Sequence, residues 1–402
     1  MIESFQSLLS DRVSAMTESA TLRMAQKARE LKNRGLDIIS LSLGEPDFDT
    51  PGHIIDAAKK ALNEGYTRYT PVTGLQVFKE AIVEKFKRDN GLLFTPANIV
   101  VSNGAKQSIS NICFSLLNEG DEVIIFSPYW VSYYEIVAFA GGKPVPVHAG
   151  IEQDFKVIPE QLEEAITPKT KAVLFSSPCN PTGSVYSKEE LQALAEVCAK
   201  HPYIVIISDE IYEYINFTGN HFSIGSLPSV KDQTVTVNGM SKGFAMTGWR
   251  LGYMGAPLWL AEACNKVQGQ STSGATSFGQ KAAAIALLSD LGPTMEMTKA
   301  FEKRKLLMID GLATIKGLIV NQPQGAFYIF PNVSEFFGKS NGRHTIHDAD
   351  DFCEIMLEEA QVAMVSGAAF GDDQCVRLSY AASEDQLKEA ISRLRTALAE
   401  FI

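Results

Sequence analysis

The sequence has few cysteines and none of the paired spacings that hold metals or disulfides. Its six cysteines are scattered along 402 residues without a Cys-x-x-Cys pair, so neither a disulfide framework nor a zinc site is indicated. Reduced thiols of this kind fit a cytoplasmic protein. His344 and His347 lie near three aspartates, but their polar loop setting indicates solvated charge. We therefore expect no metal.

Long apolar runs and an excess of basic residues are also missing. No stretch approaches the length of a membrane span, and residues 1–11 lack the basic and apolar regions of a secretory signal. Lys and Arg number 36 against 47 Asp and Glu, a net charge of −11. Because nucleic acids and anionic membranes need a basic face, neither is expected as a partner. Small anionic substrates remain compatible, since a few cations create a local positive pocket.

Short apolar strands alternate with helices over much of the chain, whose length suggests two or three domains. The expected strands are 99–102, 122–126, 144–148, 172–176, 204–208 and 234–237. Helices are expected between them, for example at 76–88, 107–117 and 188–200. This alternation predicts an α/β domain over residues 51–293, with a mostly parallel sheet covered by helices on both faces.

The remaining residues predict a smaller α/β domain at 294–402. It begins with a helix at 294–315 and continues with strands at 326–330, 362–365 and 376–379 and helices at 350–360 and 384–401. Residues 1–50, with a helix at 21–35 and a strand at 38–43, are expected to pack with this smaller domain.

One lysine lies in an unusual setting. In the stretch 234–255, TVTVNGMSKGFAMTGWRLGYMG, a strand leads to Lys242 among small residues that leave room for a flat group beside the amine. Arg250 follows eight positions later and could hold a phosphate while the amine bonds to an aldehyde. A surface lysine and an ordinary ion pair would give the same local pattern, so other motifs must decide.

A second motif has the features of a phosphate site. Residues 102–107, SNGAKQ, join an expected strand to an expected helix, so that small residues open the helix at Gly104 and Ala105. Backbone N–H groups at a helix start bind phosphate. A glycine here could equally serve only to make the turn tight.

Further candidate residues follow strand ends or interrupt apolar strands. Asp209 ends the strand YIVIISD, where a buried carboxylate needs a partner. Tyr212 lies one helical turn later, on the same side. Arg377 lies in the apolar strand CVRLSYA, where its planar fork suits a carboxylate. Trp130 in SPYWVSY and Asn180 in NPTG are ambiguous, because core packing and turn formation explain them equally well.

Together these motifs resemble the class I aminotransferases that use pyridoxal phosphate, and the likeness extends from about Ser14 to the C-terminus. The resemblance implies fold type I, with a large domain built on a seven-stranded sheet and a smaller α/β domain. It also implies the cofactor pyridoxal 5'-phosphate. Within the family, the likeness is to the branch of aspartate and aspartate-prephenate aminotransferases.

The resemblance assigns roles around the cofactor ring. Lys242 is expected to bind the cofactor covalently and then to act as the catalytic base. Asp209 is expected to pair with the pyridine nitrogen, and Tyr212 and Asn180 to reach the ring oxygen. Trp130 corresponds to the aromatic residue that stacks on the ring. Lys242, Asp209 and Tyr212 are thus the expected catalytic residues.

The resemblance also assigns the phosphate contacts. Backbone N–H groups of Gly104, Ala105 and Lys106 are expected to bind the phosphate, together with the side chain of Arg250. Tyr69 corresponds to a tyrosine that reaches the phosphate of the neighbouring subunit, which implies a homodimer with shared active sites.

One position departs from the family pattern. The family often has a serine three residues before the lysine, where this sequence has Gly239. Ser241 is the candidate to replace its hydroxyl. The departure affects the expected phosphate contacts and leaves the cofactor assignment unchanged.

Substrate contacts are expected at the rim of the same site. Arg377 corresponds to the residue that binds the substrate α-carboxylate, and Gly44, in the loop SLGEPDFDTP, offers its backbone N–H to that group. Trp130 and Asn180 are expected to contact the substrate too. A lysine at the place of Lys106 binds a second carboxylate in the aspartate branch.

Thr17 lies in the segment that lines this second pocket in that branch. The implied reaction is L-aspartate plus 2-oxoglutarate to oxaloacetate plus L-glutamate, with prephenate and arogenate as a further pair.

Three alternatives remain open: an aminotransferase for alanine, aromatic or other neutral amino acids, a lyase on the same fold, and a cofactor-binding module of a transcription regulator. The last would need a DNA-binding appendage, for which residues 1–13 are too short and insufficiently basic.

Overall fold

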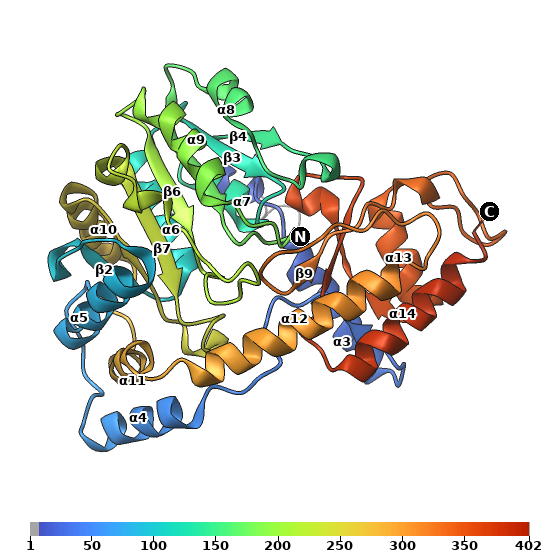
Figure 1. Ribbon diagram of the computed structural model, residues 1–402, viewed down its shortest axis with the longest axis horizontal. Helices are drawn as coiled ribbons and strands as arrows, with labels where there is room; N and C mark the ends of the chain where they lie inside the picture. The colour runs from blue at the N-terminus through green and yellow to red at the C-terminus, as the bar shows by residue number, and fades with distance from the viewer. Residues whose placement is uncertain (1–7, 402) are drawn as a thin grey trace.

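The computed structural model describes residues 8–401, so residues 1–7 and 402 of the expected terminal segments lie outside the described residues. Within them, the chain forms a large lobe around a seven-stranded sheet and a smaller lobe beside it (Figure 1). No helix among residues 8–401 is both long and apolar enough to cross a membrane.

The large sheet is mostly parallel, as predicted. Its strand order is β2-β8-β7-β6-β5-β3-β4. The strands are β2 (Ile99–Ser102), β3 (Glu122–Ser127), β4 (Lys143–His148), β5 (Thr170–Ser176), β6 (Val205–Asp209), β7 (Thr234–Gly239) and β8 (Gly252–Gly255). Strand β8 runs antiparallel to β2 and β7, whereas the pairs between β7 and β4 are all parallel.

Helices cover both faces of this sheet. Val205 and Ile207 of β6 belong to the core under helices α6, α7 and α10, whereas Ile206 belongs to the core under α8 and α9. Helices α4, α5 and α11 cover β2 and β8. Burial on both faces explains why the central strands are apolar throughout. The helices are α4 (Gly52–Asn63), α5 (Gln76–Lys85), α6 (Ala105–Leu116), α7 (Ser132–Phe139), α8 (Pro159–Ala165), α9 (Lys188–Ala199), α10 (Leu258–Ser271) and α11 (Ser277–Leu288).

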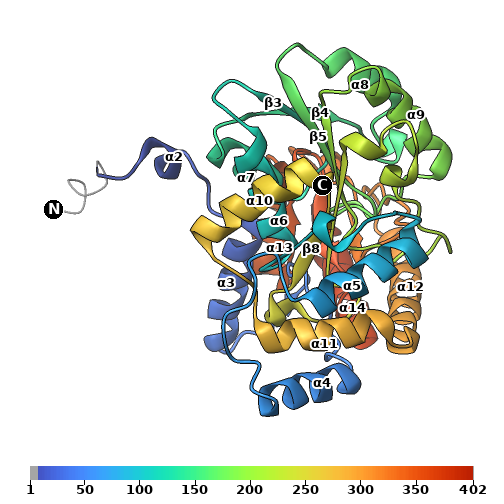
Figure 2. The same ribbon diagram turned by 90° about the vertical axis from the view of Figure 1, so that its left-hand side faces the viewer.

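The smaller lobe has an antiparallel sheet of order β11-β12-β9. Strand β1 pairs in parallel with β10, which brings the N-terminal segment onto this lobe. The short helix α2 extends from the body (Figure 2). The elements are α2 (Asp11–Ser14), α3 (Ala20–Asn33), β1 (Ile39–Ser40), β9 (Tyr328–Ile329), α13 (Ala349–Glu359), β10 (Val362–Ala363), β11 (Val365–Ser366), β12 (Val376–Ser379) and α14 (Glu384–Leu398). The domain boundaries at 50 and 293 stay a prediction.

The long helix α12 (Gly292–Leu312) joins the two lobes. Near its start, Thr294 Oγ1 donates to the carbonyl of Gly243 at 2.7 Å. Farther along, Arg304 pairs with Asp47 at 2.6 Å, and the helix packs against α14. The start of α12 is therefore fastened beside Lys242.

Several predicted elements differ from the structure, and the strands expected at 38–43 and 326–330 are only two residues long, as β1 and β9. The helix expected at 76–88 is α-helical only to Lys85 and continues as a π-helical turn, η1 (Phe86–Asn90), which ends at the left-handed Gly91. The strand expected at 362–365 is two strands, because β10 pairs with β1 and β11 pairs with β12. Strand β8 was not predicted, since its four residues GYMG include two glycines and give no strand pattern.

Candidate active site

The carboxyl ends of the parallel strands open into one cavity of about 330 Å³. Asp209 ends β6, and Lys242 follows β7 by three residues. Ligands in open α/β sheets bind at this edge. The predicted residues that line the cavity are Gly44, Ala105, Lys106, Trp130, Asn180, Asp209, Tyr212, Ser241, Lys242, Arg250 and Arg377.

Three predicted residues do not line this cavity. Gly104 lies directly behind it, as the residue before α6. Thr17 is exposed and donates its hydroxyl hydrogen to Glu135 of α7 at 2.5 Å. Tyr69 is 99% exposed. The roles of Thr17 and Tyr69 stay predictions.

Asp209 is 3% exposed and accepts two hydrogen bonds. The hydroxyl of Tyr133 donates to Oδ2 at 2.6 Å, and the backbone N–H of Ile211 donates to Oδ1 at 3.2 Å. Burial raises the pKa of Asp209 to about 6 despite these two bonds. The carboxylate therefore lies where a cationic N–H would stabilise it.

Lys242 lies on the cavity floor with its amine beside aromatic rings. Its Nζ donates to the carbonyl of Gly44 at 2.5 Å and lies 5.9 Å from the ring centres of Tyr212 and Phe327. Burial lowers the pKa of the Lys242 amine to about 8, and the Glu45 carboxylate opposes this shift. A larger neutral fraction makes the amine a better nucleophile and base.

The turn before α6 is shaped around Arg250. Gly104 has φ +89°, and a Cβ there would meet Nη2 of Arg250 within 2.3 Å. Arg250 donates to the carbonyls of Asn103 at 3.2 Å and Thr247 at 3.0 Å. Glycine is therefore required both by the backbone and by the approach of the guanidinium. The helix start and the cation face the same space, as anion binding requires.

Arg377 projects from β12 and is 1% exposed. Its Nη1 donates to Asn180 Oδ1 at 2.9 Å and its Nη2 to the carbonyl of Ser42 at 2.6 Å. The guanidinium stacks on Tyr328, 4.6 Å from the ring centre. Its Nε has no hydrogen-bond partner. This buried cation has no carboxylate among the partners described.

The cavity walls combine aromatic rings with hydroxyl groups. Tyr212 and Tyr328 share a hydrogen bond of 2.8 Å between their hydroxyl oxygens. Lys106 also lines the cavity and is exposed, with its Nζ 4.9 Å from the ring centre of Trp130. A flat ring and its polar substituents would meet complementary groups in this space.

Sequence reasoning missed Tyr133 and Tyr328 as site residues. Tyr133 lies in SPYWVSYYE, where four aromatic residues crowd together and only the register of α7 selects the one that reaches Asp209. Tyr328 was expected only as part of the strand at 326–330. Its hydroxyl approaches so closely that a Cβ at Gly44 would meet it at 2.4 Å, a signal visible only in three dimensions.

These residues fit pyridoxal phosphate. The turn that a Cβ at Gly104 would fill, with Arg250 beside it, suits the phosphate. Asp209 would accept from the pyridine N–H, and Lys242 would supply the amine for the aldehyde. The unpartnered Nε of Arg377 leaves a donor for a substrate carboxylate. Gly239, by contrast, has no room for a side chain, since its Cβ would meet the carbonyl of Leu251 at 2.9 Å.

Comparison with known proteins agrees with this donor set. The family model described as aminotransferase class I and II matches residues 36–394. A protein of Geobacillus stearothermophilus named aspartate aminotransferase is 50% identical over 96% of this chain and 98% of its own length. One of Nitrosomonas europaea named aspartate/prephenate aminotransferase is 46% identical over 97% of this chain and 99% of its own.

A solved structure shares the fold as well. The aspartate aminotransferase from Rhizobium meliloti superposes with a TM-score of 0.95 at 41% sequence identity, covering 98% of this chain and 99% of that one. The chain thus belongs to the class I and II aminotransferases, enzymes that transfer amino groups with pyridoxal phosphate as cofactor.

Proposed function

We propose that this enzyme transfers the amino group of L-aspartate to 2-oxoglutarate, giving oxaloacetate and L-glutamate. The observation that carries this proposal is that two of the four cations lining the cavity, Arg377 and Lys106, have side chains with no proposed contact to the cofactor. Arg377 is buried and Lys106 is exposed. Two cations suit substrates with two carboxylates. The names of the relatives above support the same substrates.

The residues around the cofactor would divide the chemistry among them. Bound pyridoxal phosphate supplies an electron sink that acidifies the substrate Cα–H bond. Lys242 would hold the cofactor and then move the proton from Cα. Asp209 would keep the pyridine nitrogen protonated, while Tyr212 and Asn180 donate to the ring oxygen and Trp130 fixes the ring plane. Each of these side chains already lines the cavity.

The phosphate and the substrate carboxylates would be bound by separate groups. Ala105, Ser241 and Arg250 line the phosphate end, with Gly104 immediately behind. Arg377 would bind the α-carboxylate in a two-point contact, and Gly44 would add a backbone N–H. Lys106 would bind the second carboxylate.

Prephenate is a second proposed amino acceptor, giving arogenate. It carries two carboxylates, as the acids above do, and the Nitrosomonas europaea relative is named for both activities. The same two cations would therefore bind it. The larger ring would lie toward the open mouth, where Leu22 and Leu43 line the cavity.

A half-reaction tests these substrates. Purified protein loaded with pyridoxal phosphate is mixed separately with aspartate, glutamate, alanine, tyrosine or arogenate, and the absorbance of the bound cofactor is followed. Rapid conversion by aspartate and glutamate supports the proposal, and conversion by arogenate supports prephenate as a substrate. Conversion by alanine or tyrosine alone would show that the enzyme is specific for neutral amino acids. No conversion by any donor would favour a lyase or a binding module.

We also propose a cytoplasmic homodimer with shared active sites. Tyr69 projects fully into solvent, and the N-terminal arm exposes apolar side chains at Leu8, Leu9, Val13 and Met16. A second copy that covers these residues would bring Tyr69 to the neighbouring phosphate site. The cysteines are all free, which suits a reducing compartment. An active monomer in sedimentation at assay concentration would contradict the dimer.

A further inference from the structure

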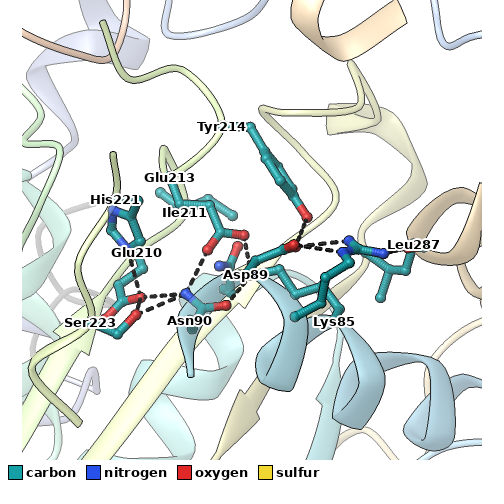
Figure 3. A network of polar contacts seen from close by, with 12 residues as sticks. Lys85, Asp89, Asn90, Glu210, Ile211, Glu213, Tyr214, His221, Ser223 and Leu287 are labelled. Atoms are coloured by element: carbon teal, nitrogen blue, oxygen red, sulfur yellow. Dashed lines mark hydrogen bonds and ion pairs between the residues drawn. The ribbon is translucent and has the colours of Figure 1, made fainter. Parts of the chain in front are cut away.

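A cluster of buried charged side chains contacts the segment that begins at the last residue of β6 (Figure 3). This segment, Asp209 to Tyr214, contains a turn in which Glu213 N donates to the carbonyl of Glu210 at 2.9 Å. Asp209 and Tyr212 line the cavity, whereas Glu210 and Glu213 do not. The segment therefore presents two side chains to the cofactor site and two to the cluster.

Asn90 is the centre of the cluster. Its Nδ2 lies 3.0 Å from Glu210 Oε2 and 2.8 Å from Glu213 Oε2. It also lies 2.8 Å from Ser223 Oγ. Lys85 donates to Asn90 Oδ1 at 2.7 Å and forms an ion pair with Glu213. The π-helical turn η1 (Phe86–Asn90) sets the register that places Asn90 here, and such turns often occur at functional sites.

His221 closes the cluster on its outer side. Its Nε2 lies 2.8 Å from Glu210 Oε2, which Ser223 also contacts, and the imidazole is 10% exposed. Burial lowers the pKa of His221, but the charges of Glu210 and Glu213 outweigh this effect and Lys85 only partly offsets them, so the pKa is raised. These are the charged groups that face the ring.

The cluster is balanced in charge and needs no metal. Glu210, Glu213 and His221 offer three ligand atoms within reach of a single cation. The ammonium of Lys85 already lies against Glu213, however, and is itself fully buried. With His221 protonated, two cations balance two carboxylates, which is the condition for burying such a group at tolerable cost.

The cluster is coupled to Asp209 through the chain. Burial is the main cause that raises the pKa of Asp209, and the carboxylate of the adjacent Glu210 raises it further. A cation that offsets Glu210 therefore favours the ionised form of Asp209. The carboxylate that pairs with the pyridine nitrogen must be ionised, so the charge balance of the cluster affects cofactor binding.

We propose that Lys85, Asn90 and His221 are positioning residues for the cofactor contacts of Asp209 and Tyr212. All three hold the intervening segment by Glu210 and Glu213, and the charges of Lys85 and protonated His221 neutralise these carboxylates. This inference rests on the proposed cofactor roles of Asp209 and Tyr212. Wild-type protein is therefore measured first: if it neither binds pyridoxal phosphate nor forms a borohydride-stable link at Lys242, the proposed function fails, whatever the variants do.

The first test alters the charge balance in the core of the cluster. Lys85→Met leaves one uncompensated carboxylate, and Lys85→Met with Glu213→Gln restores the balance. We expect the single change to raise the dissociation constant of pyridoxal phosphate about tenfold or more, and the double change to return it to within about threefold of wild type. Equal affinity in all three proteins, with only thermal stability reduced, would overturn the proposal.

The second test does not depend on whether Lys85→Met folds. His221→Gln keeps a donor for Glu210 but removes the charge, and His344→Gln is the matched control, since His344 also contacts a carboxylate, Glu359, at 3.2 Å in the smaller lobe. We expect the ratio of variant to wild-type dissociation constants to exceed about three near pH 6, where the raised pKa keeps His221 protonated, and to fall toward one as the pH rises and His221 loses its proton. A ratio that is independent of pH, or equal in the control, would overturn the proposal.

Discussion

Tyr133 donates its hydroxyl hydrogen to Asp209 across 2.6 Å, and both side chains are buried. This bond lowers the pKa of Asp209 against the larger effect of burial, which raises it. Tyr133 therefore favours the ionised carboxylate that the pyridine nitrogen needs.

Replacing Tyr133 should weaken cofactor binding. Tyr133→Phe removes one hydrogen bond to a charged group, which is worth about 1.5–3 kcal/mol, so the dissociation constant of pyridoxal phosphate should rise roughly tenfold to a hundredfold. Tyr134→Phe is the control, because Tyr134 is 41% exposed and one position away. Fluorescence titration with the cofactor measures both. A similar affinity for the two variants would contradict this role of Tyr133.

Asp209 should destabilise the cofactor-free protein at neutral pH. Its pKa is about 6 in the folded chain and 3.8 ordinarily, so the folded state binds more protons between these values. The contribution of Asp209 to the free energy of unfolding should therefore fall as pH rises through this window and stay constant above it. Asp209→Asn should lack this loss of stability. Its free energy of unfolding should therefore exceed that of the wild type by an amount that grows to about 3 kcal/mol as the pH rises.

Urea denaturation of both proteins at several pH values between 3.5 and 8 measures this difference. The same variant should bind pyridoxal phosphate much more weakly, because an amide cannot balance the charge of the pyridinium. A stability difference that does not change across the window would show that the Asp209 carboxyl is not perturbed by burial.

Gly104→Ala should reduce affinity for the phosphate of the cofactor. A Cβ at this position meets Arg250 at 2.3 Å, so the guanidinium must move. Gly120→Ala is a matched control, because Gly120 has φ +86° but an open space around it. Both changes should cost about 1 kcal/mol of stability through backbone strain. Only Gly104→Ala should weaken binding of pyridoxal phosphate. Equal binding by both variants would argue against a phosphate site at the turn before α6.

Replacing Lys106 and replacing Arg377 should affect different sets of substrates. Lys106→Ala should lower kcat/KM for aspartate about tenfold to a hundredfold and leave alanine almost unchanged, since only aspartate has a second carboxylate. Arg377→Lys should impair both donors, because both have an α-carboxylate and lysine lacks the planar fork. Steady-state kinetics with each donor measures these effects. If Lys106→Ala lowered kcat/KM equally for aspartate and alanine, Lys106 would contribute only to binding the cofactor phosphate and not to binding the second carboxylate.

The sequence was sufficient for the features whose causes are local. Apolar strands followed by a carboxylate, an asparagine or a lysine predicted both the parallel sheet and the residues at its edge, because strand ends meet at one edge by topology. Asp209, Asn180 and Lys242 are far apart in sequence and still line one cavity. Their roles toward the cofactor stay predictions.

Features that depend on packing could not be predicted. Lys85 lies in the sequence KFKR, where three cations look like a solvated helix face, but it is fully buried at the end of α5 and its ammonium pairs with Glu213. Thr17 was expected in a segment that lines the substrate pocket; Ser19, Thr21 and Leu22 of that segment line the cavity, whereas the role of Thr17 itself stays a prediction. Both outcomes depend on tertiary contacts that no short segment encodes.

Helix α12 has a mechanical consequence. Its 21 residues make a rod about 30 Å long, bonded at one end to Gly243 beside Lys242 and packed at the other end against α14. A rotation of about 10° around the bonded end would carry the far end through about 5 Å. The smaller lobe, which carries Arg377, could thus rotate as a rigid body with the far end of α12, while Lys242 stays close to the rotation axis.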